Sequence, residues 1–482
     1  ARGDTAGARA LFVAALDGAN LGSTYRGGVL RAAALQAMER LEQFRSSHAF
    51  RGQGERGQQR MDQLMPLLLE AVGATAEPAT VLGRTLKLPE SIARRTAYLA
   101  LLVESPLVLS QLVRLESASP WIASQLTRHP ILLDGMLDPR QLYSPLKREE
   151  LEGELDTLMA AVDPEDTEEQ MERLRQFLQG NKLRVAAADV TDVIPLMVVS
   201  DYLTEIAEAI VGRVLEQVWS YLVARHGRPA GIDDGTGFAV IAYGKMGGIE
   251  LGYGSDLDLV FIHGNSDANA MTDGGRQIAN DLFFARLGQR LIHMLTARTA
   301  SGLLYEVDMR LRPSGNSGML VSSLEAFDEY QRNMAWTWEH QALLRARPIA
   351  GDPVVAERFQ AIRRGVLSQQ RDPGKLLQEV VEMREKMRVS LDKSSQELFD
   401  LKQGPGGIAD IEFMVQYAVL RWAHSHPDLL DWTDNIRLLE GLARHELFAP
   451  AEADALADAY RSFRSATHRL ILQAKPTLVS RD

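Results

Sequence analysis

Residues 238–264 read FAVIAYGKMGGIELGYGSDLDLVFIHG, and this stretch decides the fold. Two β-type runs, 238–244 and 257–263, are bounded by glycines, which predicts two short strands joined by a turn-rich loop. Asp256 and Asp258 flank Leu257 at the start of the second run. Because successive side chains of a strand point to opposite faces, these two carboxylates are expected to share one face.

A third acid comes from YEVDMRLR, residues 305–312. Its alternation predicts a strand within 302–313 whose polar face carries Asp308, Arg310 and Arg312. If the strands are neighbours, about 4.8 Å apart, the three carboxylates repel one another unless cations lie among them. Mg²⁺ prefers such oxygen ligands and serves displacement at phosphorus. Asp256, Asp258 and Asp308 are therefore predicted to be catalytic, metal-binding residues; capping of turns is the alternative.

Phosphate contacts are expected from the segment YGKMGG, residues 243–248. Backbone N–H groups of such a glycine-rich turn can cradle phosphate, Lys245 adds a positive charge, and Ser255 can donate a hydrogen bond. The alternative is a plain tight turn. Guanidinium groups bind phosphate or carboxylate bidentately, with structural ion pairing as the alternative. The candidate arginines are Arg310, Arg312, Arg345 and Arg347.

Three further patterns have structural interpretations beside functional ones. The cluster AWTWEHQAL, residues 335–343, either lines a nucleotide pocket or packs in an interdomain core. In GPGGIADIEFMVQ, residues 404–416, Asp410 and Glu412 fall in the first turns of a predicted helix, where capping is the preferred interpretation. Tyr460 lies on an apolar stripe near the end of the chain and is predicted to be bundle core.

Composition limits the function classes. The 482 residues carry a net charge of −11 spread along the chain, which disfavours a nucleic-acid backbone as the main partner. The absence of cysteine excludes thiol catalysis and fits a cytoplasmic location. No apolar run approaches the roughly 18 residues needed to span a membrane. The sequence begins at Ala1 without an initiator Met, and we expect it to be a piece of a longer polypeptide.

The predicted fold class is α+β and mostly helical, in three regions. Residues 1–225 form a helical region, in which Leu203, Ile206, Ile210, Val214 and Val218 make one apolar stripe. A segment rich in Gly, Pro and Asp then leads into a small mixed-sheet unit over 226–352. Residues 353–482 return to helix and are expected to form a C-terminal bundle.

Four segments together resemble one enzyme family. They are YGKMGGIELGYGSDLDLVFIH, LYEVDMRLRPSGNSGMLVSSLEAFDEYQ, AWTWEHQALLRARPIAGD and GGIADIEFMVQYAVLR. Over nearly the whole chain, and in the family's order, they are similar to the glutamine synthetase adenylyltransferases, also called glutamate-ammonia-ligase adenylyltransferases. That family carries two nucleotidyltransferase units of the DNA polymerase β superfamily. One removes AMP from glutamine synthetase by phosphorolysis, and the other attaches it.

The resemblance implies the C-terminal, adenylylating half, because only one S-D-x-D site is present and the helical lead-in matches that half. The implied reaction moves AMP from MgATP to a tyrosine hydroxyl of glutamine synthetase, with a PII signal protein as partner and glutamine as effector. Asp256, Asp258 and Asp308 match the family's metal-binding acids, and Gly247, Gly248 and Ser255 its triphosphate contacts.

The glycine spacing leaves one question open. Seven residues separate Gly248 from Asp256, which is short for the superfamily, whereas ten separate Lys245 from Asp256, so either Gly247-Gly248 or Gly244-Lys245 can contact the phosphates. Three rival functions also stay open: the adenylyl-removing reaction, a non-catalytic scaffold that binds PII, and a template-directed polymerase. The acidic charge disfavours the last of these.

Overall fold

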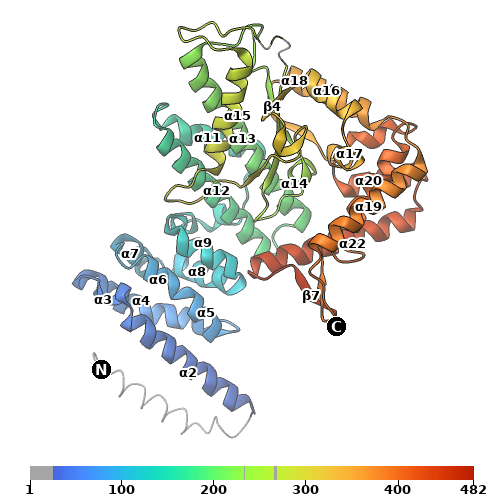
Figure 1. Ribbon diagram of the computed structural model, residues 1–482. Coiled ribbons are helices and arrows are strands. Elements are labelled where there is room, and N and C mark those ends of the chain that lie inside the picture. Colours follow the sequence, from blue (N-terminus) through green and yellow to red (C-terminus); the bar gives the residue numbers. More distant parts are fainter. Residues whose placement is uncertain (1–24, 233, 265–266, 268, 482) are drawn as a thin grey trace. The chain divides into compact units, whose positions relative to one another are not determined.

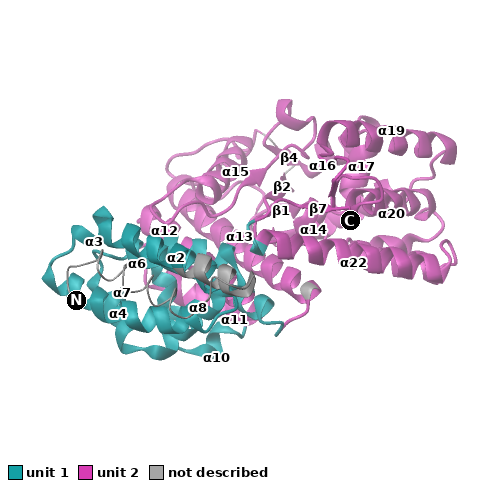
Figure 2. Cartoon of the chain, turned by 90° about the horizontal axis from the view of Figure 1, so that it is seen from below, with its two compact units in different colours: residues 1–144, 186–193, 472–474 teal, residues 145–185, 194–471, 475–482 magenta. Residues whose placement is uncertain are grey.

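The computed structural model describes residues 25–232, 234–264, 267 and 269–481 (Figure 1). Of the helical region predicted over 1–225, residues 1–24 lie outside the described residues. Two compact units are distinguished in Figure 2. Unit 1 comprises residues 1–144, 186–193 and 472–474, and unit 2 comprises residues 145–185, 194–471 and 475–482.

The described part of unit 1 consists of helices joined by short connections. Their bounds are α2 (Tyr25–Ser46), α3 (His48–Arg51), α4 (Glu55–Gly73), α5 (Pro78–Thr85), α6 (Lys87–Ser91), α7 (Thr96–Glu104), α8 (Pro106–Ala118), α9 (Pro120–Arg128), η1 (Pro130–Met136) and α10 (Pro139–Leu142). Ser-Pro pairs start α8 and α9, because Ser105 and Ser119 accept hydrogen bonds from the N–H groups of Val108 and Ile122 while proline occupies the first helical position.

Three further helices precede the sheet, namely α11 (Arg148–Ala160), α12 (Thr167–Val190) and α13 (Leu196–His226). The predicted stripe on α13, from Leu203 to Val218, is buried. No single helix among the described residues is long and apolar enough to cross a membrane. The bent pair α7 and α8, taken together, reaches that length and composition.

The sheet of unit 2 has the strand order β3-β2-β1-β5, with β4 also paired to β2. Its strands are β1 (Phe238–Ala242), β2 (Leu257–His263), β3 (Val307–Asp308), β4 (Val321–Ser323) and β5 (Arg347–Gly351). β1 is antiparallel to β2 and β5, whereas β2 is parallel to β3 and β4, so the sheet is mixed. The expected mostly helical α+β class with a small mixed sheet is therefore confirmed.

The parallel pairing of β2 with β3 positions the acids. In this register Asp258 lies opposite Asp308 and Leu257 lies opposite Val307. The strand predicted within 302–313 is much shorter than expected, because β3 contains only two residues. After Asp308, its carboxylate accepts the N–H of Arg310 at 2.8 Å and the chain turns, so the alternation of side chains does not continue to Arg312.

The remaining helices complete unit 2. They are α14 (Gly244–Gly247) before β2, then α15 (Asn280–Thr296), η2 (Gly315–Ser317), α16 (Leu324–Asn333), α17 (Thr337–Leu344), α18 (Pro353–Leu367), α19 (Pro373–Leu391), α20 (Ile408–Trp422), η3 (Pro427–Asp431), α21 (Asn435–Arg444) and α22 (Pro450–Leu472). A two-stranded ribbon pairs β6 (Leu398–Asp400) with β7 (Leu478–Ser480). One apolar core runs from Ile241 and Ile262 of the sheet to Val415 and Leu439 of the last helices.

Candidate active site

The three predicted acids converge. Carboxylate oxygens of Asp256, Asp258 and Asp308 lie within 4.8 Å of one another. Asp258 and Asp308 are half-buried, while Asp256 is exposed. Oxygen donors at this spacing suit a hard divalent cation such as Mg²⁺.

The electrostatics of the group support a cation there. Burial raises the pKa of Asp258 to about 6, and the charges of Asp256 and Asp308 add to this shift. The hydrogen bond from Arg310 instead lowers the pKa of Asp308, whose carboxylate accepts from Arg310 Nε at 2.8 Å. Repulsion among the acids is thus partly relieved by one guanidinium on the exposed side, and the three oxygens fit a bound metal.

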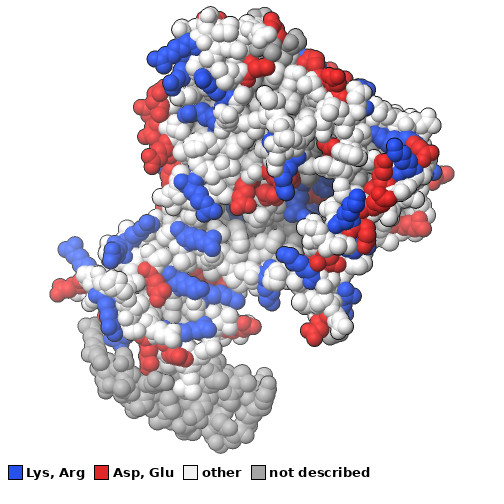
Figure 3. All heavy atoms as spheres, in the orientation of Figure 1, with Lys and Arg blue, Asp and Glu red and all other residues white. Residues whose placement is uncertain are grey.

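The acids line a cavity of about 380 Å³ in unit 2. Figure 3 shows acidic and basic side chains next to each other beside a hollow in this unit. Residues of the sheet loops and of the C-terminal helices share the lining. Those used below are Gly244, Lys245, Glu250, Ser255, Asp256, Asp258, Asp308, Arg310, Arg345, Lys402, Glu412, Tyr460, Arg464 and His468.

The glycine turn has one position where glycine is required by space and conformation. Gly244 has a φ of +55°, and a Cβ there would lie 2.1 Å from Oδ2 of Asp258. The backbone of the turn is held to β2, since the N–H of Tyr243 donates to the carbonyl of Asp258 at 2.8 Å. Gly244 and Lys245 therefore border the acids directly.

Gly247 and Gly248 lie elsewhere. Neither belongs to the residues lining the cavity, and a Cβ on Gly247 would lie 1.8 Å from the carbonyl oxygen of Arg345. The Gly247 carbonyl accepts hydrogen bonds from Thr433 Oγ1 at 2.7 Å and Arg347 Nε at 3.1 Å. In this structure these two glycines allow close packing, and the turn that borders the cavity is formed by Gly244 and Lys245.

Of the remaining predicted phosphate contacts, three line the cavity and one, Arg312, does not. Lys245 lines the cavity, and burial, with the neighbouring Lys402 charge, lowers its pKa. Ser255 also lines it, with its Oγ accepting the N–H of Gly252 at 3.0 Å. Arg310 lines the cavity with a largely exposed side chain. Arg312 instead binds the carbonyls of its own turn, including that of Met309 at 2.8 Å, and does not line the cavity.

Arg345 and Arg347 form structural ion pairs. Arg347 pairs with Glu208 and binds the Met246 carbonyl at 3.1 Å. Arg345 pairs with the buried Glu250 and, at 2.7 Å, with Glu412. Ion pairing, the alternative for both arginines, is therefore what the structure contains, although Arg345 also borders the cavity.

Glu250 is the centre of this buried network. Its Oε2 accepts from Tyr460 Oη at 2.6 Å, and Arg464 Nη2 donates to its backbone carbonyl at 3.0 Å. Burial alone would raise its pKa, but Arg345 and Arg464 outweigh burial and lower it. The residues of this network line one part of the cavity, and their contacts join α20 and α22 to the loop before β2.

Several lining residues were not predicted. Lys402 precedes the GPGG turn, whereas Arg464 and His468 follow Tyr460 on α22 at helical spacing. Burial lowers the pKa of His468 to about 3, so this imidazole is neutral at ordinary pH. Tyr460, predicted to be core only, is buried but carries its hydroxyl into the Glu250 network. The sequence signal that could have identified them is the spacing of Tyr460, Arg464 and His468, which are four residues apart and therefore share one face of α22.

Two other predictions have different outcomes. In the segment 335–343, Trp336 is 71% exposed and does not line the cavity, whereas Glu339 and Leu343 are buried, so the packing interpretation holds for the second half of the segment. Asp410 accepts the N–H of Gly406 at 2.6 Å near the start of α20, as the capping interpretation expects. Glu412, two residues further, instead faces the cavity and pairs with Arg345.

Comparison with known proteins agrees with the family resemblance of the sequence motifs. The family model described as "Glutamate-ammonia ligase adenylyltransferase" matches residues 109–362, and one described as "GlnD PII-uridylyltransferase" matches residues 375–477. Relatives named "Bifunctional glutamine synthetase adenylyltransferase/adenylyl-removing enzyme" are 56% identical in Thioalkalivibrio sulfidiphilus, 53% in Nitrosococcus oceani and 49% in Hahella chejuensis.

These alignments cover 92%, 94% and 94% of this chain but 46%, 48% and 48% of the respective relatives. The chain thus spans about half the length of the curated relatives it matches. The family model covers more than half of the chain and contains all three converging acids. The chain belongs to the glutamate-ammonia ligase adenylyltransferase family.

Proposed function

We propose that this chain transfers AMP from ATP to a tyrosine hydroxyl of glutamine synthetase and releases pyrophosphate. The observation that carries the proposal is the meeting of Asp256, Asp258 and Asp308 within 4.8 Å at a cavity that also contains Lys245 and Lys402. Acids suited to a metal and cations suited to a triphosphate are both required for nucleotidyl transfer. The names of the relatives supply glutamine synthetase as the acceptor.

The cavity residues divide into two roles. Asp256, Asp258 and Asp308 would hold Mg²⁺, which when bound supplies charge neutralisation at the reacting phosphorus. Lys245, Lys402 and the backbone of the Gly244 turn would bind the phosphate oxygens and orient them. Arg345 and Arg464 are held by Glu250 and keep these walls in place rather than contacting ATP.

In the reaction, the tyrosine oxygen attacks the α-phosphorus, and the bond from that phosphorus to the oxygen bridging the β-phosphate breaks. Pyrophosphate leaves with the electron pair of that bond. A free tyrosine has a pKa near 10, so its proton must be accepted as the new bond forms. Asp308 is the candidate base, since its carboxylate is kept ionised and oriented by Arg310.

The test uses unmodified glutamine synthetase, ATP and Mg²⁺, with mass spectrometry of the glutamine synthetase tyrosine peptides. The chain should add one AMP group, and Asp256→Asn should reduce the rate by about a thousandfold or more, because a metal ligand is lost. Near-normal AMP incorporation by that variant would refute the assignment.

A matched control is Asp458→Asn, which removes an exposed carboxylate on α22 that does not line the cavity. It should keep full activity. Thermal unfolding of both variants should match that of the unmodified chain, so that loss of activity in Asp256→Asn is attributed to chemistry and not to folding.

A second candidate function is AMP removal, because the relatives' names join an adenylyltransferase with an adenylyl-removing enzyme and the chain spans about half of them. Adenylylated glutamine synthetase supplied with inorganic phosphate separates the two. Release of ADP without ATP consumption would assign the chain to removal. We place it on the forward reaction because its single S-D-x-D motif and helical lead-in resemble the adenylylating half.

The proposal has further elements that rest on the family resemblance. A PII protein is the proposed partner, glutamine the proposed effector and the cytoplasm the proposed location, and the match to the PII-uridylyltransferase model supports the first of these. The proposed domains are a helical region over 1–225, a catalytic region over 226–352 and a helical bundle over 353–482. Binding of PII to the chain, measured with and without glutamine, tests the partner and the effector together.

A further inference from the structure

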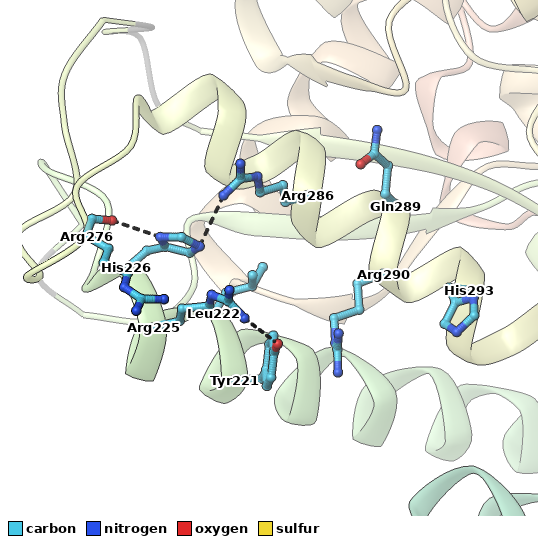
Figure 4. Close-up of a pocket in the computed structure, with 9 residues that line it drawn as sticks. All are labelled: Tyr221, Leu222, Arg225, His226, Arg276, Arg286, Gln289, Arg290 and His293. Atoms are coloured by element: carbon cyan, nitrogen blue, oxygen red, sulfur yellow. Dashed lines mark hydrogen bonds between the residues drawn. The ribbon is translucent and has the colours of Figure 1, made fainter. Parts of the chain in front are cut away.

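A second cavity in unit 2, of about 510 Å³, is lined by basic side chains (Figure 4). Its residues come from the end of α13, from the loop before α15, and from one face of α15. They are Tyr221, Leu222, Arg225, His226, Arg276, Arg286, Gln289, Arg290 and His293. Neither the acids of the active site nor any other Asp or Glu belongs to this lining.

Among the described residues, the four arginines of this cavity have no acidic partner. Within the part of the chain that the structure describes, no ion pair joins Arg225, Arg276, Arg286 or Arg290 to a carboxylate. Arg345 and Arg384, in the same unit, do pair with carboxylates. In a chain of net charge −11, four guanidinium groups around one cavity repel one another unless an anion lies among them.

The side chain of His226 holds the guanidinium of Arg286 and the backbone of Arg276. The buried His226 contacts Arg286 Nη1 through Nε2 at 3.2 Å and the Arg276 carbonyl through Nδ1 at 2.8 Å. Since the guanidinium can only donate, Nε2 accepts and Nδ1 carries the proton. His226 thus connects the loop before α15 to Arg286, as the dashed lines of Figure 4 show.

Arg290 is held from the other side. Its guanidinium lies 3.7 Å from the centre of the Tyr221 ring, and its Nη2 donates to Thr167 Oγ1 at 3.1 Å. Figure 4 shows Arg290 reaching from α15 toward Tyr221 on α13. Arg225 Nη1 contacts the hydroxyl of the same tyrosine at 3.0 Å. A guanidinium held in this way loses less conformational freedom when it binds an anion.

We propose that this cavity is a binding site for a small phosphate-bearing ligand, separate from the active site. Guanidinium forks match phosphate oxygens, and forks arriving from two helices and a loop suit a tetrahedral group better than a planar carboxylate. Four positive charges suit a ligand with at least two negative ones, and 510 Å³ lies in the range of small-molecule sites. The site does not depend on the proposed catalytic reaction.

The experiment uses the full chain without Mg²⁺ and inorganic pyrophosphate as the probe. An arginine-specific dicarbonyl reagent modifies exposed guanidinium groups, and peptide mass spectrometry gives the rate at each one. Pyrophosphate should slow modification of Arg276, Arg286 and Arg290 by about fivefold or more, because bound oxygens cover their N–H groups. The exposed Arg444, which lines neither cavity, should react at an unchanged rate.

Calorimetry of variants gives the second measurement. Arg286→Gln combined with Arg290→Gln should weaken or remove one of two pyrophosphate-binding events by at least about tenfold, whereas Arg444→Gln should leave both unchanged. Equal protection of all arginines, or unchanged binding by the double variant, would overturn the proposal. Succinate that binds this site as tightly as pyrophosphate would overturn the assignment to phosphate.

Discussion

Two buried glutamates, one in each unit, show how differently this protein treats a buried acid. Glu116 lies on α8 of unit 1 and Glu250 lies in the loop before β2 of unit 2; they are 0% and 2% exposed. Burial raises the pKa of Glu116 to about 8, and Thr85 and Arg84 offset this only in part. The pKa of Glu250 is lowered, because Arg345 and Arg464 together outweigh the effect of burial.

The comparison shows that burial fixes the cost of a charge while its neighbours fix the charge state. Glu116 is held as a neutral acid at pH 7 and acts as a polar core residue. Glu250 stays ionised and is bound to two arginines and a tyrosine beside the candidate active-site cavity. The ionised Glu250 fixes Arg345 and Arg464 beside the cavity, and this positioning is a reason to keep a buried ion pair there despite the cost of removing its charges from water.

The largest effect is expected from removing the paired acid. Glu250→Ala leaves Arg345 and Arg464 buried with less compensation, and should destabilise unit 2 by about 3–5 kcal/mol. Chemical denaturation measures the loss in free energy of unfolding, and native-state hydrogen exchange of the sheet strands shows whether unit 2 is the part that is destabilised. A change below about 1 kcal/mol would show that Glu412 alone satisfies Arg345 and that the comparison overstates the role of Glu250.

The next effect depends on pH and concerns Glu116. Its folded pKa of about 8 lies above the ordinary value of 4.5, so the folded chain keeps a proton that the unfolded chain has lost between those values. The stability of unit 1 should therefore fall as pH rises, by roughly 2–3 kcal/mol between pH 5 and pH 7. Glu116→Gln cannot ionise and should remove most of that slope.

Denaturation of both proteins at pH 5, 6, 7 and 8 tests this expectation. The variant should be more stable than the parent at pH 8 and should differ least from it at pH 5. Parallel pH profiles for the two proteins would mean that Glu116 is ionised in the folded chain and paired as Glu250 is.

A smaller effect is expected from the neutral member of the Glu250 network. Tyr460→Phe keeps the ring but removes the hydroxyl that donates to the ionised Glu250 at 2.6 Å and accepts from Asn435 Nδ2 at 2.8 Å, and should cost about 1.5–3 kcal/mol. Because Tyr460 borders the cavity, AMP transfer is measured on the same samples. A loss of stability with a normal rate of AMP transfer would show that Tyr460 has a structural role only.

The smallest effect is expected from an exposed pair. Asp458→Ala breaks the contact of Asp458 with Arg461 at 2.9 Å on the surface of α22. Solvent screens both charges, so stability should change by less than about 0.5 kcal/mol. Equal losses for Asp458→Ala and Tyr460→Phe would show that burial does not set the scale on this helix.

Predictability from sequence differed between the acids and their surroundings. Asp256 and Asp258 could be placed on one face because alternation along a strand is local, and β2 has the bounds predicted for it. The position of Arg312 could not be predicted, because the strand ends at Asp308. The chain then forms a turn in which the Arg312 guanidinium donates to the carbonyl of Met309. Gly247 and Gly248 show a related ambiguity, because a glycine required by packing has the same sequence signal as one that contacts phosphate, and their assignment as triphosphate contacts stays a prediction.

The sequence by itself determined the mostly helical α+β class, the glycine-bounded strands, the family and the identity of the three acids, because each depends on neighbouring residues or on motif order. Only the tertiary structure decided that Asp308 lies opposite Asp258, that Lys402, Tyr460 and Arg464 complete the cavity, and that four arginines share a second one. Strand register and the packing of distant helices arise from contacts between residues far apart in the chain, and no local pattern specifies those contacts.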